Sequence, residues 1–166
     1  MAVEVKGLAE AIRHLEAVQA RARNLKPVLD VAAADTVALI DDAFETSISP
    51  SGRPWPGLAS STERQRRKGR GRGSDGTTLP HKILVDTGRL RGSINATGDA
   101  HNLRFGTNVG YGLFHQAGTR RMPSRAFLPI DGSPGLFALA TSGPAGSHWQ
   151  RVRDAVRRYV LTGEVS

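Results

Sequence analysis

The sequence predicts an α+β fold in which N-terminal helices pack on a small antiparallel sheet, with extended loops and a C-terminal helix. Apolar residues recur at helical spacing near both ends, and two short segments in the middle flank a turn. The 19 glycines and 9 prolines break up much of the remainder. With 39% hydrophobic and 5% aromatic residues in 166, we expect one modest core with substantial loops.

The N-terminal region predicts a short strand followed by two helices. Residues 2–5 alternate in the manner of a strand. An amphipathic helix is then expected over roughly 7–23, because four apolar residues recur at helical spacing: Leu8, Ile12, Leu15 and Val18. Pro27 suits the first turn of a second helix, which apolar residues extend to about residue 46. The alanines of this second helix permit close packing against a neighbour.

Turn-forming and basic residues dominate the next segment. Serines, prolines and glycines between Ser49 and Pro56 predict consecutive turns, and a short helix is expected to begin at Ser60. A mobile basic loop is predicted at about 64–78, because it has too few apolar side chains to order itself. It carries the candidate contacts to DNA or to an acidic partner: Arg64, Arg66, Arg67, Lys68, Arg70 and Arg72.

A hairpin is predicted after this loop. Asp86 is expected to cap a short helix at 87–94. Strands at 94–98 and 102–108 should pair around a turn that begins at Gly98.

The segment after the hairpin predicts a helical turn and an edge strand. The helical turn spans 111–116 and ends at Gly118. The strand lies between residues 122 and 130, where Pro123 and Pro129 cannot donate to a ladder.

Three regions are expected along the chain: an α+β core over 1–130, a Gly/Ser/Pro-rich linker at 131–146 and a C-terminal helix at 147–166. The last helix has an apolar face of Trp149, Val152, Val156, Tyr159 and Val160. Its other face is basic, with Arg151, Arg153, Arg157 and Arg158.

The formal net charge is +8, and it is unevenly distributed. Residues 1–46 hold five basic and eight acidic residues, whereas residues 47–92 hold ten basic and three acidic residues. This basic excess indicates nucleic acid or an acidic protein surface as a partner.

The absence of cysteine excludes disulfides, thiolate metal sites and a cysteine nucleophile. No apolar stretch approaches the ~18 residues of a membrane span, and no signal peptide is visible, so we expect synthesis in a cytoplasm and no membrane partner.

Two motifs invite a catalytic interpretation. Asp86-Thr87-Gly88 after three apolar residues resembles the triplet of retroviral-type aspartic proteases, but Arg89 follows where that family has a small residue. A structural turn is therefore favoured. His115 has no acid partner or nucleophile that spacing fixes, so a histidine satisfied within a packed helix–strand junction is favoured. We expect no metal and no cofactor.

Trp55, among prolines and glycines, is expected to anchor its loop to the core rather than fill a partner's pocket.

Several fragments occur in a suggestive order: Phe44, SPSGRPW at 49–55, KG at 68–69, ILVDTGRLRGSI at 83–94, FGTN at 105–108, YGLFHQAG at 111–118 and PSRAFL at 123–128. This succession resembles the phage virion morphogenesis (tail completion) family of Mu-like tailed phages, which is related to phage neck and tail-joining proteins. The resemblance implies assembly or structural roles, with no catalytic residue, for Trp55, Asp86, Thr87, Gly88, Leu90, Ile94, Tyr111, His115, Gln116, Gly118, Pro123, Arg125 and Phe127.

The resemblance also implies a function and partners. The chain would be a structural virion protein without catalysis, assembled in the bacterial host cytoplasm as a hexameric ring at the neck or tail, which joins the tail to the head. Its neighbours would be further copies of itself and the head–tail connector, tail terminator or tail tube proteins, with genomic DNA in the channel. The alternative is a nonspecific nucleic-acid-binding protein that uses the Arg/Gly loop, and an aspartic protease is third.

Overall fold

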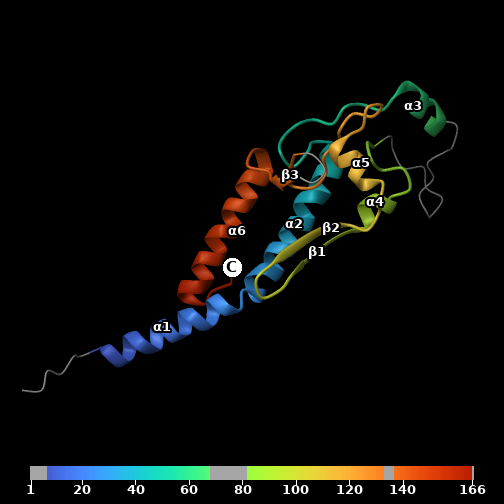
Figure 1. Ribbon diagram of the computed structural model, residues 1–166. Helices are drawn as coiled ribbons and strands as arrows, with labels where there is room; N and C mark the ends of the chain where they lie inside the picture. The colour runs from blue at the N-terminus through green and yellow to red at the C-terminus, as the bar shows by residue number, and fades with distance from the viewer. Residues whose placement is uncertain (1–6, 68–81, 133–136, 166) are drawn as a thin grey trace, which may run out of the picture.

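The computed structural model describes residues 7–67, 82–132 and 137–165 (Figure 1). Helix α2 (Lys26–Thr46) is the central element, and the other major elements pack around it. Pro27 lies in its first turn, as predicted. Eight of its side chains are buried: Val28, Leu29, Ala32, Ala33, Thr36, Ile40, Ala43 and Phe44. Their spacing places one continuous stripe against the rest of the chain.

The predicted hairpin is confirmed and packs on α2. Strand β1 (Ile94–Gly98) pairs antiparallel with β2 (Leu103–Thr107). Gly98 allows the close approach to α2, because a Cβ atom there would lie 2.6 Å from the backbone carbonyl carbon of Leu29. In the turn, Asp99 Oδ1 accepts hydrogen bonds from the backbone N–H groups of His101 and Asn102, at 2.9 and 2.8 Å. These bonds lower the pKa of Asp99.

Helix α6 (Gly143–Thr162) packs against α2 and begins earlier than the predicted residue 147. Within the expected linker, β4 (Ala138–Leu139) pairs with β3 (Ile130–Asp131). The described small residues at the C-terminal end of this segment permit tight packing. Ala140 and Ala145 are fully buried with Trp149 in a second apolar cluster, and a Cβ atom on Gly143 would lie 2.5 Å from the Ser51 carbonyl carbon.

The main apolar cluster joins α2 to the loops that follow it. Phe44 packs edge-on against Trp55, with ring centroids 5.6 Å apart, and tilted against Phe127 at 5.7 Å. Five further buried residues complete the cluster: Ile40, Ala43, Val85, Leu90 and Val109. Loops distant in sequence are therefore held on one end of α2.

Three short helices border this cluster: α3 (Ser60–Arg67), α4 (Arg89–Gly92) and α5 (Gly112–Ala117). Helix α3 begins at the predicted residue, and Gly118 ends α5 as predicted. The predicted N-cap of α4 is wrong. Gly88, in the left-handed conformation at φ 74°, occupies that position, and α4 starts two residues later than expected.

The structure describes only the first residues of the predicted basic loop. Arg64, Arg66 and Arg67 belong to helix α3, so a loop beginning at residue 64 is wrong. The remainder of that loop, with Lys68, Arg70 and Arg72, lies outside the described residues, as does the strand expected at 2–5.

Helix α1 (Leu8–Arg23) confirms the first predicted helix and projects from the body of the molecule (Figure 1). None of its side chains is buried. Its C-terminal end meets the end of α6, where Arg21 donates from Nε to the Val160 carbonyl at 2.9 Å. No helix in the described ranges combines the length and apolar character that crossing a membrane requires.

Candidate functional site

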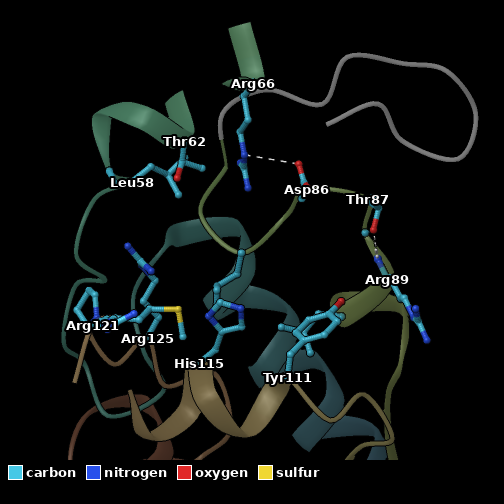
Figure 2. A pocket seen from close by; sticks show the side chains of 16 residues that line it. Leu58, Thr62, Arg66, Asp86, Thr87, Arg89, Tyr111, His115, Arg121 and Arg125 are labelled. Carbon is cyan, nitrogen blue, oxygen red and sulfur yellow. Dashed lines mark hydrogen bonds and ion pairs between the residues drawn. The ribbon is translucent and has the colours of Figure 1, made fainter. Parts of the chain in front are cut away.

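A cleft of about 490 Å³ lies between α3, α5 and the loop that precedes α4 (Figure 2). We call it the α3–α5 cleft. It gathers eight of the positions that the family resemblance singled out: Asp86, Thr87, Gly88, Leu90, Tyr111, His115, Pro123 and Arg125. It also includes Arg66 of the predicted basic set. The sequence motifs thus meet in space, although up to about 60 residues separate them in the chain.

Two backbone turns shape one wall of the cleft. Leu84 adopts a left-handed conformation at φ 61°, as does Gly88 at φ 74°. Between these turns Val85 enters the main apolar cluster, while the side chain of Asp86 faces solvent at the rim. The loop is therefore anchored from below and exposes polar groups above.

Arg66 crosses from α3 to this loop. Its Nε lies 3.6 Å from Asp86 Oδ1, and its Nη1 donates to the Lys82 carbonyl at 2.8 Å. The Arg66 side chain is 13% exposed, so it ties α3 to the loop and is not freely available to a nucleic acid. Arg64 on the same helix is exposed.

Arg125 forms the deepest positive charge of the cleft and is only 7% exposed. Its Nε donates to the Pro56 carbonyl at 2.8 Å, and its Nη2 donates to the Gly57 carbonyl at 2.6 Å. No carboxylate among the described residues forms an ion pair with it. Burial accordingly lowers the pKa of Arg125.

His115 lies beside Arg125, edge-on to Tyr111 with ring centroids 6.0 Å apart. Its Nδ1 is buried and has no hydrogen-bond partner within the described structure. The expectation of a satisfied histidine is therefore wrong, because no acceptor or donor of the neighbouring elements reaches this atom. Burial, and then the positive charge of Arg125, lower the pKa of His115 and favour the neutral imidazole.

The charge of the cleft lining is one-sided. Four arginines, Arg66, Arg89, Arg121 and Arg125, face a single carboxylate, that of Asp86, which gives a formal excess of three positive charges. Arg89 and Arg121 are exposed at opposite sides of the opening (Figure 2). Such a lining attracts anionic groups.

Gln116, on the other side of α5, has a structural role. Its Oε1 accepts from the backbone N–H groups of Phe127 and Leu128, at 3.0 and 2.9 Å, and its Nε2 donates to the Ile130 carbonyl at 3.0 Å. This side chain takes the place of a neighbouring strand. The predicted edge strand at 122–130 is consequently wrong except at its last residue, which belongs to β3.

Other motif residues also hold this segment to the core. Trp55 is 6% exposed and donates from Nε1 to the Ala126 carbonyl at 2.8 Å, which confirms its anchoring role. Phe127 is fully buried, and Ile94 packs on the same cluster. At Gly118, with φ 76°, a Cβ atom would lie 2.8 Å from the Ser124 nitrogen.

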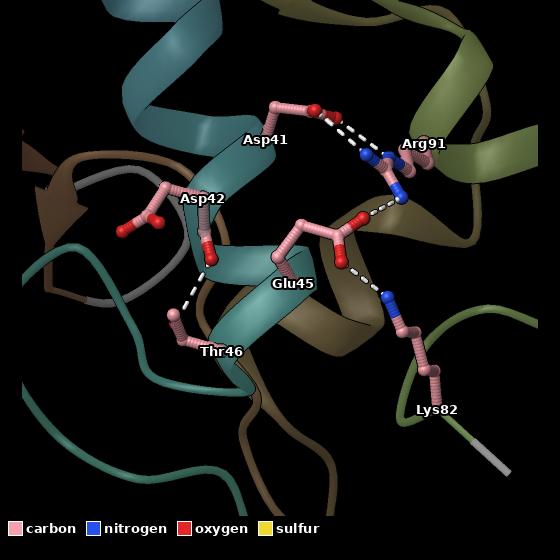
Figure 3. A network of polar contacts seen from close by, with 6 residues as sticks. All are labelled: Asp41, Asp42, Glu45, Thr46, Lys82 and Arg91. Atoms are coloured by element: carbon pink, nitrogen blue, oxygen red, sulfur yellow. Dashed lines mark hydrogen bonds and ion pairs between the residues drawn. The ribbon is translucent and has the colours of Figure 1, made fainter. Parts of the chain in front are cut away.

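A charged network that was not predicted from the sequence lies beside the cleft (Figure 3). Arg91 forms two 2.6 Å hydrogen bonds to the Asp41 carboxylate and one of 2.5 Å to Glu45, which also pairs with Lys82. Arg91 lowers the pKa of Asp41, and Lys82 with Arg91 lowers that of Glu45. The only sequence signal was the spacing of Asp41 and Glu45, which share one face of α2.

The aspartic protease alternative does not agree with the fold. Asp86-Thr87-Gly88 lies in a loop that leads into helix α4, whereas the retroviral-type fold is all-β. The Asp86 side chain is 60% exposed and pairs with Arg66. In the part of the chain that the structure describes, no group of three or more histidine, aspartate or glutamate residues is placed to hold a metal ion.

The model of the phage virion morphogenesis family matches residues 3–161, nearly the whole chain. No curated protein and no solved structure matches.

Proposed function

This chain belongs to the phage virion morphogenesis family, and on that premise we propose that it is a neck or tail-completion subunit, which joins the tail to the head. The family gives the chain a structural or assembly role in the virion. In our proposal, six copies form a ring without catalytic activity. The ring contacts the head–tail connector on one side and the tail terminator or tail tube on the other, with genomic DNA passing through it.

Helix α1 is the observation that carries this proposal. It has 16 residues and no buried side chain, although most of the stability of helices in proteins comes from tertiary packing of an apolar face. One face exposes three large apolar residues: Leu8, Ile12 and Leu15, at 56%, 47% and 65%. A neighbouring subunit would stabilise the helix by covering this face. Helix α1 projects from one end of the molecule (Figure 1). In our proposal it packs on a different surface of the next subunit, a head-to-tail contact that closes into a ring when the rotation permits.

Electron microscopy of phage particles tests the proposal. In lysates of a phage that lacks this protein, we expect heads and tails that are not joined, and supplying the protein from a plasmid should restore complete virions. Reconstruction of intact virions should show the chain as a ring at the neck. Complete infectious particles without the protein, or its location in the head shell or tail tip, would contradict the proposal.

The nucleic-acid-binding alternative retains one observation in its favour. Arg151, Arg153 and Arg157 are exposed along α6. DNA affinity of the purified chain that falls steeply with salt, and falls further when these three residues become glutamine, would favour a DNA-contacting role. Weak binding that these substitutions do not change would remove it.

A further inference from the structure

The buried positive charge of the α3–α5 cleft has no counter-charge within the described structure. Arg125 is 7% exposed and donates only to neutral carbonyl groups, those of Pro56 and Gly57. Buried charges in proteins are usually paired, because desolvation of an unpaired charge is costly. Asp86, the one carboxylate of the lining, is engaged with Arg66 at the rim. A carboxylate that entered the cleft would therefore find an unpaired guanidinium.

His115 supplies a second, independent sign of an absent partner. Its buried Nδ1 makes no hydrogen bond, and buried polar atoms are otherwise almost always satisfied. The neutral imidazole is able to donate from Nδ1 to a carboxylate oxygen or to accept from a peptide N–H at the same atom. Polypeptide offers both groups.

The mixture of apolar and basic side chains in the cleft favours a peptide over nucleic acid. Apolar side chains lie among the arginines, notably Leu58, Leu84 and Met122. An extended peptide that alternates apolar and acidic residues matches this mixture, because its successive side chains point in opposite directions. A DNA duplex presents phosphates on a convex surface, which would meet exposed Arg89 and Arg121 but not Arg125.

From these observations we propose that the α3–α5 cleft binds an acidic, partly apolar segment of a neighbouring virion protein, with a carboxylate against Arg125 and His115. The binding chemistry follows from the cleft itself, whereas the assignment of the partner to the virion rests on the proposed function. Arg89 and Arg121 would attract the segment and hold further carboxylates at the opening.

Fluorescence anisotropy with the full chain tests this site. The probe is a labelled 12-residue peptide in which glutamate alternates with leucine and alanine. The uncharged control is the same peptide with every glutamate replaced by glutamine. The double variant Arg89→Gln/Arg121→Gln should weaken binding of the acidic peptide by about tenfold. The matched variant Arg153→Gln/Arg157→Gln removes the same charge from exposed positions on α6 and should change the affinity by less than about twofold.

His115→Phe separates binding from folding. It removes the unpartnered Nδ1, so the melting temperature should be unchanged or raised. The affinity for the acidic peptide should fall by about threefold or more. A lowered melting temperature with unchanged peptide affinity would contradict the role given to His115.

Three results would overturn the proposed site. They are no saturable binding of the acidic peptide, equal weakening by both double variants, and a 12-base-pair DNA duplex that binds more tightly with the same dependence on Arg89 and Arg121. None of these results bears on whether heads and tails join in the absence of the protein. The cleft and the ring role are therefore tested separately.

Discussion

Helices α1 and α2 follow each other directly in the chain and are both amphipathic, yet they relate to the fold in opposite ways. Helix α2 buries eight side chains against the hairpin, α6 and the loops, whereas α1 buries none. Helix α2 is thus stabilised by its own chain, and α1 presents its apolar face to solvent. If α1 has the assembly role proposed for it, core stability and assembly depend on different helices, and separate measurements should detect them.

The largest effect on stability is expected near the C-terminal end of α2, in the main apolar cluster. Phe44→Ala removes a fully buried ring that contacts Trp55 and Phe127, and should lower the free energy of unfolding by about 3–5 kcal/mol. Urea denaturation measures this change. Val31→Ala on the exposed side of the same helix is the control and should cost less than about 1 kcal/mol. Similar losses for both variants would contradict a one-sided α2.

Gln116 on α5 holds the 122–130 segment in place through hydrogen bonds to its backbone. Gln116→Leu leaves the N–H groups of Phe127 and Leu128 without their acceptor, and should cost about 2–4 kcal/mol of unfolding free energy. The control is Leu113→Gln, on the exposed side of α5. If Gln116→Leu unfolds with the wild-type urea midpoint, the segment does not depend on this side chain.

These two positions show what the sequence was able to predict. Helices α1, α2 and α6 and the β1–β2 hairpin carry their periodicity locally, and all four were predicted. The 122–130 segment was predicted to contain an edge strand, because Pro123 and Pro129 cannot donate to a ladder. Its hydrogen-bonding partner is instead one side chain on α5, which no local pattern reveals. The Gly, Ser and Pro content of 131–146 indicated a linker, whereas α6 already begins at Gly143, where close contact with Ser51 leaves no room for a Cβ atom.

The candidate site was predictable only as a set of positions. The order of the fragments singled out Asp86, His115 and Arg125, but their meeting in one cleft depends on how α3, α5 and two loops pack. Arg66 was placed in a loop because the segment has few apolar side chains, but it lies in helix α3 and pairs with Asp86. The Arg91–Asp41 contact joins residues 50 positions apart, which charge spacing along one helix does not predict.

Acidic pH should destabilise the α2–α6 contact. Thr36 Oγ1 donates to the Ala32 carbonyl and therefore accepts from His148 Nε2 at 3.0 Å, in a fully buried pair. Burial and the nearby Arg151 lower the pKa of His148, against a smaller opposing effect of Asp35. The unfolded chain then binds the proton more readily, so unfolding free energy should fall as the pH drops below about 6.5.

Urea midpoints at pH 7.5 and 5 measure this loss. His148→Gln keeps a donor toward Thr36 and should reduce the pH dependence, whereas His115→Phe removes only the contribution of the other histidine with a lowered pKa. A wild-type midpoint that rises on acidification would contradict the assignment of a neutral His148.

A smaller effect is expected where α2 meets α4. Arg91→Gln removes the bonds to Asp41 and should cost at most about 1 kcal/mol, because the pair is partly exposed and screened by solvent. The lowered pKa of Asp41 means that its contribution is present above pH 3.8 and is lost as the pH falls through the folded-state value. Lowering the pH should therefore narrow the difference in unfolding free energy between Arg91→Gln and the wild type. The control Arg89→Gln, on the same helix, should have the wild-type unfolding free energy at every pH.

The smallest effect on folding, and the largest on assembly, is expected in α1. Leu15 is 65% exposed, and glutamine has a helix propensity close to that of leucine, so Leu15→Gln should change the unfolding free energy of the isolated chain by less than about 0.5 kcal/mol. If α1 packs on a neighbouring subunit, the same substitution places a polar group in that contact and should reduce incorporation into purified particles, measured by mass spectrometry. Glu16→Gln, one residue away on another face, is the control for both measurements. A large loss of stability in the isolated chain would show that α1 belongs to its own core, and normal incorporation would show that its apolar face is not an assembly surface. A stable chain that fails to enter particles would instead separate α1 from α2 by function, as their burial already separates them by structure.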